Sequence, residues 1–153
     1  MKLKQLLTAI KYRAEQVPDV DITDLVYDSR KAVPGCAFVC LRGANADGHK
    51  YAKMAAEKGA AVIIAEEIVE APVPVILTEN TRLALAYLSA EFFGHPAEQM
   101  HVIGITGTKG KTTTAFMMRS ILEAAGHKTG VIGTIGVLYG DCLLYTSPSP
   151  RDS

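Results

Sequence analysis

The stretch GITGTKGKTTT, residues 104–114, combines residue types that bind nucleotide phosphates. Gly107 and Gly110 allow the backbone to curl until successive amide N–H groups point at one anion. Lys111 supplies a mobile cation for the outer phosphates, and the hydroxyl of Thr112 is placed to bind Mg²⁺. We therefore predict Lys111 as the catalytic cation and Thr112 as the metal ligand. The predicted phosphate-binding residues are Gly107, Thr108, Lys109, Gly110, Lys111, Thr112 and Thr113.

The fit to the general phosphate-loop pattern is incomplete. A glycine, four residues and Gly-Lys-Thr would require glycine at position 105, which is Ile105. The core GTKGKTT, residues 107–113, nevertheless lies between an apolar run expected as a strand, residues 101–106, and a helical pattern over residues 111–126. A glycine-rich turn that binds nothing is the alternative on these residues alone.

The composition excludes several classes of partner. Sixteen basic residues balance sixteen acidic ones, so no long-range positive field favours nucleic acid or an anionic membrane. The apolar stretch near the N-terminus is interrupted at Thr8 and closed by Lys11, which makes it too short for an export signal. The three cysteines, Cys36, Cys40 and Cys142, show no paired metal-ligand spacing, and Cys36 and Cys40, in an apolar stretch, are expected to be buried free thiols. We expect a soluble, cytoplasmic protein that binds small molecules.

Strand and helix patterns alternate along the chain, which predicts an α/β fold with a mostly parallel sheet. Apolar runs predict strands within residues 24–30, 36–41, 60–66, 73–79 and 128–137. Helical spacing predicts helices over residues 3–10, 48–58 and 81–93. Asp47 is expected to cap the second of these helices, and Asn80 or Thr81 the third. Residues expected on one face of the third helix are Leu83, Tyr87, Ala90 and Phe93.

The segment GHPAEQ, residues 94–99, is the expected domain boundary because Gly94 and Pro96 both end a helix. This gives an N-terminal domain over residues 1–97 and a second domain over residues 98–141. Residues 142–153 end in alternating Ser and Pro, which favours an extended, unpacked and non-native tail. A flexible natural terminus is the alternative.

The stretch GITGTKGKTTT resembles the ATP loop of the Mur ligase family, whose motif is Gly-Thr-(Asn or Lys)-Gly-Lys-Thr. TGVIGTIG, residues 129–136, is similar to the segment that follows in the MurE type, the UDP-N-acetylmuramoyl-dipeptide:amino-acid ligases. Residues 28–66 resemble the uridine-nucleotide-binding domain shared by the MurE and MurF types. The resemblance implies a Rossmann-like N-terminal domain, followed by the truncated start of a P-loop ATP-binding central domain.

The resemblance also implies residues that hold the UDP end of the substrate. They are Tyr27, Ser29, Ala44, Asn45 and Ala46. The competing interpretation of DSR, residues 28–30, is a plain turn in which Asp28 bonds local amides and Arg30 pairs with an acid. For His49 we weighed contact with the pyrophosphate against a partly exposed position at a helix start.

The activity implied by the resemblance is ATP- and Mg²⁺-dependent amide formation in peptidoglycan synthesis. A diamino acid would be joined to UDP-N-acetylmuramoyl-L-alanyl-D-glutamate through an acyl phosphate. Further active-site residues of the family would lie downstream of the ATP loop, so the 153-residue chain is expected to be inactive by itself. The alternatives are a MurF-type ligase and a generic P-loop nucleotide-binding module.

Overall fold

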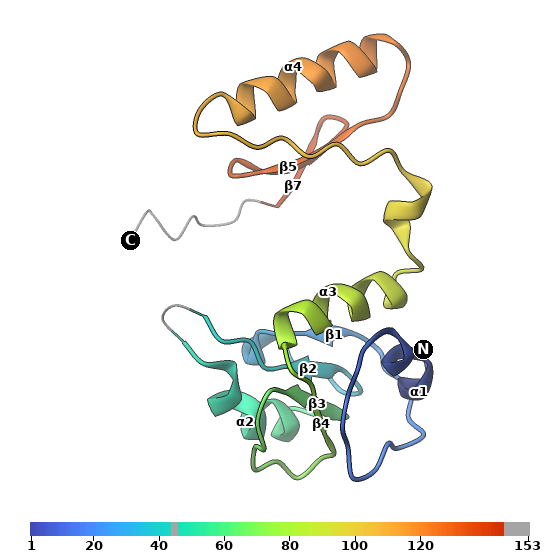
Figure 1. The fold of residues 1–153 in the computed structure, drawn as a ribbon, viewed down its shortest axis with the longest axis vertical. Helices are drawn as coiled ribbons and strands as arrows, with labels where there is room; N and C mark the ends of the chain where they lie inside the picture. The colour runs from blue at the N-terminus through green and yellow to red at the C-terminus, as the bar shows by residue number, and fades with distance from the viewer. Residues whose placement is uncertain (44–45, 146–153) are drawn as a thin grey trace. The chain divides into compact units, whose positions relative to one another are not determined.

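The computed structural model describes residues 1–43 and 46–145 (Figure 1). The chain divides into two compact units, Met1–His101 and Val102–Ser153, which we call unit 1 and unit 2. The boundary predicted after residue 97 falls inside a short 3₁₀ helix, η4 (Pro96–Gln99), just before this division. No described helix is long and apolar enough to cross a membrane.

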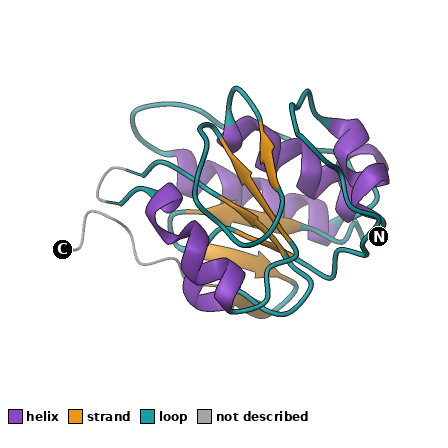
Figure 2. Ribbon diagram, turned by 90° about the horizontal axis from the view of Figure 1, so that it is seen from below, coloured by secondary structure: helices purple, strands orange, loops and turns teal. Residues whose placement is uncertain are grey.

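Unit 1 is built on a parallel sheet with the strand order β1-β2-β3-β4 (Figures 1 and 2). The strands pair in parallel along the whole sheet and lie inside the predicted apolar runs. Their bounds are β1 (Leu25–Val26), β2 (Ala37–Val39), β3 (Val62–Ala65) and β4 (Val75–Leu77). The predicted α/β class and parallel sheet are therefore confirmed.

Helices cover both faces of this sheet. Successive strand residues point to opposite faces, so Ala37 and Val39 join one apolar cluster while Phe38 joins another. The first cluster is completed by α1 (Leu3–Leu6), the 3₁₀ helix η1 (Leu7–Ala9) and α3 (Thr81–Phe92), and the second by α2 (Ala52–Glu57). A parallel sheet buried on both faces is Rossmann-like, as the resemblance to the Mur ligases implied.

The cysteines divide between core and surface. Cys36 and Cys40 are buried free thiols, as predicted, and burial raises the pKa of the Cys40 thiol to about 12. Cys142, which the sequence assigns to the predicted tail, is exposed. It lies on a strand of unit 2, where little apolar surface is covered.

Side chains cap the helices where the sequence placed their starts. The Asn80 side chain accepts a hydrogen bond of 2.9 Å from the Leu83 N–H, which makes Asn80 rather than Thr81 the cap of α3. Asp47 accepts a 3.0 Å bond from the His49 N–H at the start of η3 (Gly48–Tyr51), which leads into α2. Both assignments satisfy amides that a helix start leaves without partners.

Helix α3 meets the sheet with different residues from those expected. Thr81, Ala84 and Leu88 are its buried residues. Leu83, Tyr87 and Phe93 are exposed. Apolar residues occur on more than one side of this helix, so spacing alone did not select the side that the sheet covers.

The described part of unit 2 consists of one helix and an antiparallel sheet with the strand order β5-β6-β7. Its elements are α4 (Lys111–Ala124), β5 (Gly130–Gly133), β6 (Gly136–Tyr139) and β7 (Cys142–Tyr145). The predicted helix is confirmed, but the single strand expected over residues 128–137 is a hairpin that reverses at Thr134 and Ile135. Neither turn residue belongs to the types that mark a two-residue hairpin turn.

The strand expected over residues 101–106 does not form, because these residues pair with no described strand. A strand needs a neighbour for its N–H and C=O groups. Val102 is 71% exposed and Ile103 is 57% exposed. An apolar run predicts a strand only where the fold supplies a partner.

The end of the described chain differs from the expected unpacked tail. Cys142–Tyr145 pair with β6 after a turn at Gly140 and Asp141, in which Gly140 has φ +55°. A Gly-Asp pair followed by apolar residues is a hairpin signal. The Ser- and Pro-rich residues 146–153, for which the tail was chiefly predicted, lie outside the described residues.

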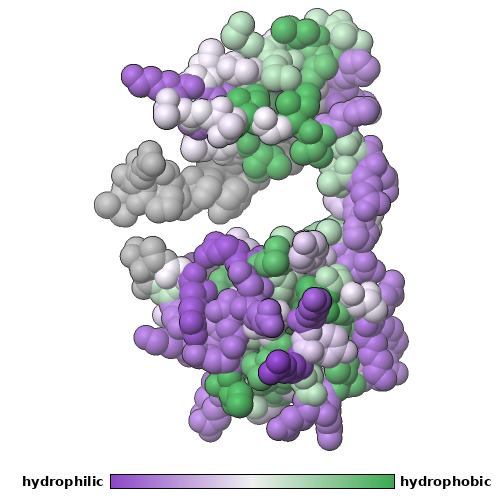
Figure 3. Space-filling view, in the orientation of Figure 1, coloured by the Kyte–Doolittle hydropathy of each residue, from purple (hydrophilic) through white to green (hydrophobic). Residues whose placement is uncertain are grey.

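Unit 2 leaves much of its apolar surface uncovered, as the green atoms in Figure 3 show. No residue of α4 is buried. Met117 and Ile121 of α4 and Ile132 of β5 are all more than half exposed. The core of the molecule is therefore in unit 1.

Candidate functional site

The predicted phosphate loop leads directly into the N-terminus of α4. Gly107 has φ +150° and Gly110 has φ +76°, which L side chains rarely adopt, so glycine allows the curl at both positions. Gly110 is the residue before the helix, and no side chain caps the first turn. The first amides of an α-helix have no intrahelical partner, and the helix dipole is positive at that end. The first turn therefore offers donors to an anion.

The side chain of Lys111 folds back over this loop. Its ammonium group donates a hydrogen bond of 2.5 Å to the Gly107 carbonyl. The predicted ATP-binding residues from Gly107 to Thr113 are all exposed. A flexible cation thus lies beside the uncapped first turn, which is the combination that a phosphate requires.

Thr112 is exposed in the first turn of α4 and offers one neutral oxygen. Mg²⁺ prefers six oxygen ligands and is often held by substrate phosphates and water, with few protein ligands. A single hydroxyl beside a phosphate site fits that manner of binding. Among the described residues, the one group of three metal-ligating side chains is Asp47, His49 and Glu67, in unit 1.

The predicted uridine-binding residues that are described share one edge of the unit 1 sheet. Tyr27 and Ser29 follow β1, and Ala46 follows the neighbouring β2. Ligands of open parallel sheets bind outside the carboxyl ends of the strands. The topology therefore brings these residues to the edge where a ligand is expected. The other predicted residues, Ala44 and Asn45, lie outside the described residues.

The turn after β1 has the local bonds that the plain-turn interpretation of DSR predicts. Asp28 accepts a 3.0 Å bond from the Arg30 N–H and a 2.8 Å bond from its guanidinium group. Bonding to the Arg30 side chain, followed by the bond to its backbone, lowers the pKa of Asp28 to about 2. Asp28 and Arg30 therefore form the plain turn. Between them, Ser29 is 7% exposed, while Tyr27 is 61% exposed.

The loop after β2 has a paired base. The Gly43 N–H donates to the Ala46 carbonyl and the Gly48 N–H to the Leu41 carbonyl, each at 2.8 Å. A Cβ atom on Gly48 would lie 2.7 Å from the Leu41 nitrogen, so glycine is required there. Residues 41–43 are thereby held against residues 46–48, and we call these six residues the loop base.

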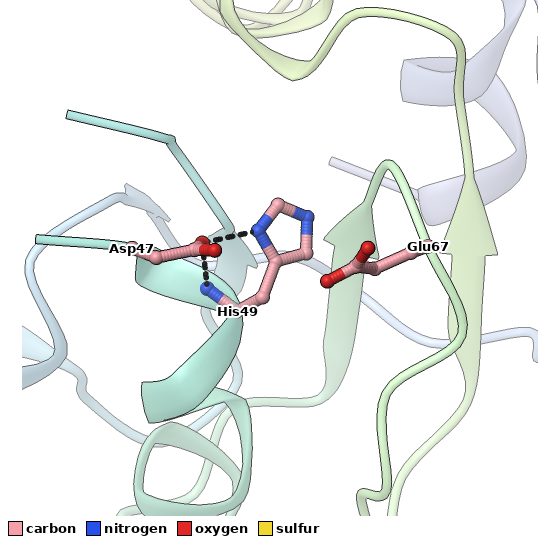
Figure 4. Close-up of side chains that lie close together, drawn as sticks. All are labelled: Asp47, His49 and Glu67. Atoms are coloured by element: carbon pink, nitrogen blue, oxygen red, sulfur yellow. Dashed lines mark hydrogen bonds and ion pairs between the residues drawn. The ribbon is translucent and has the colours of Figure 1, made fainter.

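His49 directly follows the loop base and is buried, which corrects the expectation of a partly exposed histidine. Its Nδ1 is 2.6 Å from a carboxylate oxygen of Asp47 (Figure 4). Its Nε2 accepts a 3.0 Å bond from the Glu66 N–H. Both ring nitrogens are thus engaged within the protein. Neither remains for the pyrophosphate contact that we weighed.

The same bonds argue against a metal ion among Asp47, His49 and Glu67 (Figure 4). A neutral imidazole that bound a metal through Nδ1 would carry its proton on Nε2. That proton would face the Glu66 N–H, which is itself a donor. The cluster is better described as a hydrogen-bonded support of the loop base.

Sequence reasoning missed the partners of this support. One Glu66 carboxylate oxygen accepts bonds of 2.9 Å from the Thr81 N–H and 3.0 Å from its hydroxyl. Arg42 pairs with Glu67 at 2.7 Å. Arg42 and Glu66 are charged residues close behind buried strands, and that position was the available signal.

Comparison with known proteins places these features in a family. Residues 21–93 match the model described as Mur ligase family, catalytic domain, and residues 105–150 match the Mur ligase middle domain. The UDP-N-acetylmuramoyl-L-alanyl-D-glutamate--2,6-diaminopimelate ligase of Bacillus licheniformis is 50% identical over 139 residues, which are 88% of this chain and 28% of that protein.

Solved structures give the same result. MurF from Acinetobacter baumannii is similar with a TM-score of 0.65 and 36% identity, over 79% of this chain and 27% of that one. MurF ligase from Thermotoga maritima in complex with ADP is similar with a TM-score of 0.54 and 32% identity, over 66% of this chain and 23% of that one. The chain spans less than a third of the length of these relatives. With two family domains matched in succession, the chain belongs to the Mur ligase family.

Proposed function

We propose that this chain supplies the UDP-substrate domain and the ATP loop of a MurE-type ligase. In this proposal a diamino acid is added to UDP-N-acetylmuramoyl-L-alanyl-D-glutamate during peptidoglycan synthesis in the cytoplasm. The observation that carries it is the uncapped first turn of α4 with the Lys111 ammonium group folded over the loop. The 50% identity to a diaminopimelate ligase supports the MurE type.

The proposed reaction requires charge neutralisation more than covalent chemistry by the protein. The free carboxylate of the D-glutamyl residue attacks the γ-phosphate of ATP, which gives an acyl phosphate and ADP. The amine of the diamino acid then displaces phosphate and forms the amide. Lys111 and the first amides of α4 bind and orient the triphosphate, while the carboxyl edge of unit 1 binds the uridine end. Mg²⁺, with Thr112 as one ligand, supplies further positive charge at the phosphates.

The first test removes the proposed cation from the complete enzyme. Lys111→Ala is expected to lower the rate of ADP release at least about 100-fold, because an electrostatic contact to the transferred phosphoryl group is lost. Binding of the UDP-muramyl-dipeptide, measured by calorimetry, is expected to stay unchanged. Lys128→Ala, at another exposed lysine of unit 2, is the control and should keep normal turnover. Near-normal turnover of Lys111→Ala would contradict the proposal.

A MurF-type ligase is the second candidate, because the similar solved structures at 36% identity are MurF proteins. The complete enzyme distinguishes the two. Turnover with UDP-N-acetylmuramoyl-L-alanyl-D-glutamate and a free diamino acid supports the MurE type. Absence of turnover with that pair, in an enzyme that still hydrolyses ATP with a longer muramyl peptide, supports the MurF type. A generic P-loop module would bind ATP but no UDP-muramyl substrate.

A further inference from the structure

A continuous chain of hydrogen bonds links the loop base to the N-terminus of α3. Asp47 follows Ala46 in the loop base and bonds His49; His49 bonds the Glu66 N–H; the Glu66 carboxylate bonds Thr81. We call Asp47, His49, Glu66 and Thr81 the His49 bridge. It connects the ends of β2 and β3 to the start of α3, all at the carboxyl edge of the unit 1 sheet.

The bridge fixes the proton on the His49 ring. The Glu66 N–H can only donate, so Nε2 must accept and carries no proton. The hydrogen of the neutral ring is then on Nδ1, where it donates to the Asp47 carboxylate at 2.6 Å. Only the neutral Nδ1–H tautomer satisfies both partners. The His49 side chain is 3% exposed, so water does not replace either bond.

Arg42, a residue of the loop base, makes further contacts with the bridge and with α3. The Arg42 Nε atom lies 3.8 Å from carboxylate oxygens of both Asp47 and Glu66. The Arg42 carbonyl accepts a 2.9 Å bond from the Arg82 guanidinium group of α3. Asp47 is therefore shared between Arg42 and His49, and its orientation depends on both.

We propose that His49 is a positioning residue for the uridine nucleotide. His49 acts through Asp47 and does not touch the ligand. Its Nδ1–H holds the Asp47 carboxylate, and that carboxylate orients the loop base, which follows β2 as the Ser29 turn follows the neighbouring β1. This inference rests on the proposed binding of a uridine nucleotide at the carboxyl edge. The inference identifies His49 as a residue that holds the loop base in its binding conformation before the ligand binds.

Two substitutions of His49 distinguish the role of its bond to Asp47 from that of its bond to Glu66. The side-chain amide of Asn can place a donor near the Nδ1 position, so His49→Asn keeps the bond to Asp47. The amide oxygen of Gln can take the Nε2 position, so His49→Gln keeps the bond from Glu66 and loses the one to Asp47. His95→Asn is the matched control, because His95 is an exposed histidine of unit 1 with φ +53°, a conformation that Asn tolerates.

Binding of UDP-N-acetylmuramoyl-L-alanyl-D-glutamate to the complete enzyme is measured by calorimetry. His49→Gln is expected to bind about tenfold more weakly than the unsubstituted protein, since a bond to a charged group is lost. His49→Asn is expected to stay within about threefold of the unsubstituted protein, and His95→Asn to be equal to it. Equal binding by His49→Gln would overturn the positioning role alone. Absence of binding by the unsubstituted complete enzyme would overturn the proposed substrate as well.

The tautomer itself can be observed without a substitution, which keeps the proposal testable if a variant fails to fold. Long-range ¹H–¹⁵N correlation spectra of the unsubstituted protein at neutral pH should show His49 with a protonated Nδ1 and an unprotonated Nε2. A proton on Nε2, or a doubly protonated ring, would contradict the bridge.

Discussion

At the scale of single residues, the ionised side chain of Asp28 makes a pH-dependent contribution to the free energy of unfolding. Because Arg30 lowers the pKa of Asp28 to about 2, the folded state favours the ionised carboxylate more than the unfolded chain does. This stabilisation is fully present above the unfolded pKa of about 4 and is lost as the pH falls towards 2. Arg30 is mostly exposed to solvent, so screening limits the contribution to about 1 kcal/mol.

Urea unfolding of the unsubstituted chain and of Asp28→Asn tests this. We expect a difference in the free energy of unfolding of about 1 kcal/mol at pH 7 that disappears near pH 2. Glu70→Gln, at an exposed acid of unit 1, should show no such pH-dependent difference. A difference that is constant between pH 7 and pH 2 would show that the effect is not the ionisation of Asp28.

Single residues also show how far sequence reasoning reaches. The backbone curl at Gly107 and Gly110 could be predicted because positive φ is a local property of glycine. Glu66 could not be predicted as a partner of His49, since the two are 17 positions apart and meet only when β2 and β3 pair. Bonds between elements require the fold, and no local pattern encodes them.

At the scale of elements, Lys58 ties the end of α2 to the turn that carries Ser29. Its ammonium group donates to the Ser29 carbonyl at 3.1 Å and the Arg30 carbonyl at 3.4 Å. Lys58→Met keeps the apolar stem but removes these donors, so we expect the free energy of unfolding to fall by about 1 kcal/mol. Chemical denaturation measures this loss. Lys53→Met, on an exposed position of the same helix, should leave the midpoint unchanged, and an equal shift in both variants would contradict the tie.

Helices and strands were predicted best where a capping residue marks the start and an apolar face enters the core. Asp47 and Asn80 marked helix starts correctly because each bonds an amide within its own helix. The apolar run over residues 101–106 failed as a strand, and the run over 128–137 folded into two strands. Whether an apolar segment forms a strand depends on a neighbouring strand with which it can pair. The sequence of the segment itself does not specify that neighbour.

At the scale of the whole molecule, the two units differ in how much they bury. Unit 1 encloses two apolar clusters, one on each face of its sheet. Helix α4 of unit 2 has no buried residue. Amide protection against hydrogen exchange depends on the cost of local opening, which is low where few apolar contacts are made. The units should therefore open independently.

Hydrogen exchange followed by mass spectrometry at low protein concentration tests this difference. Peptides that cover β2 and β3 are expected to be protected at least about 100-fold more than peptides from α4, because burial in water-excluded clusters raises the opening free energy. Limited trypsin digestion should cut after Lys111 and Arg119 before any site in the core of unit 1. Equal protection of α4 would mean that its exposed apolar residues, Met117 and Ile121 among them, are covered in solution. Repeating the exchange at a tenfold higher concentration then shows whether a second copy covers them, since only such protection would rise with concentration.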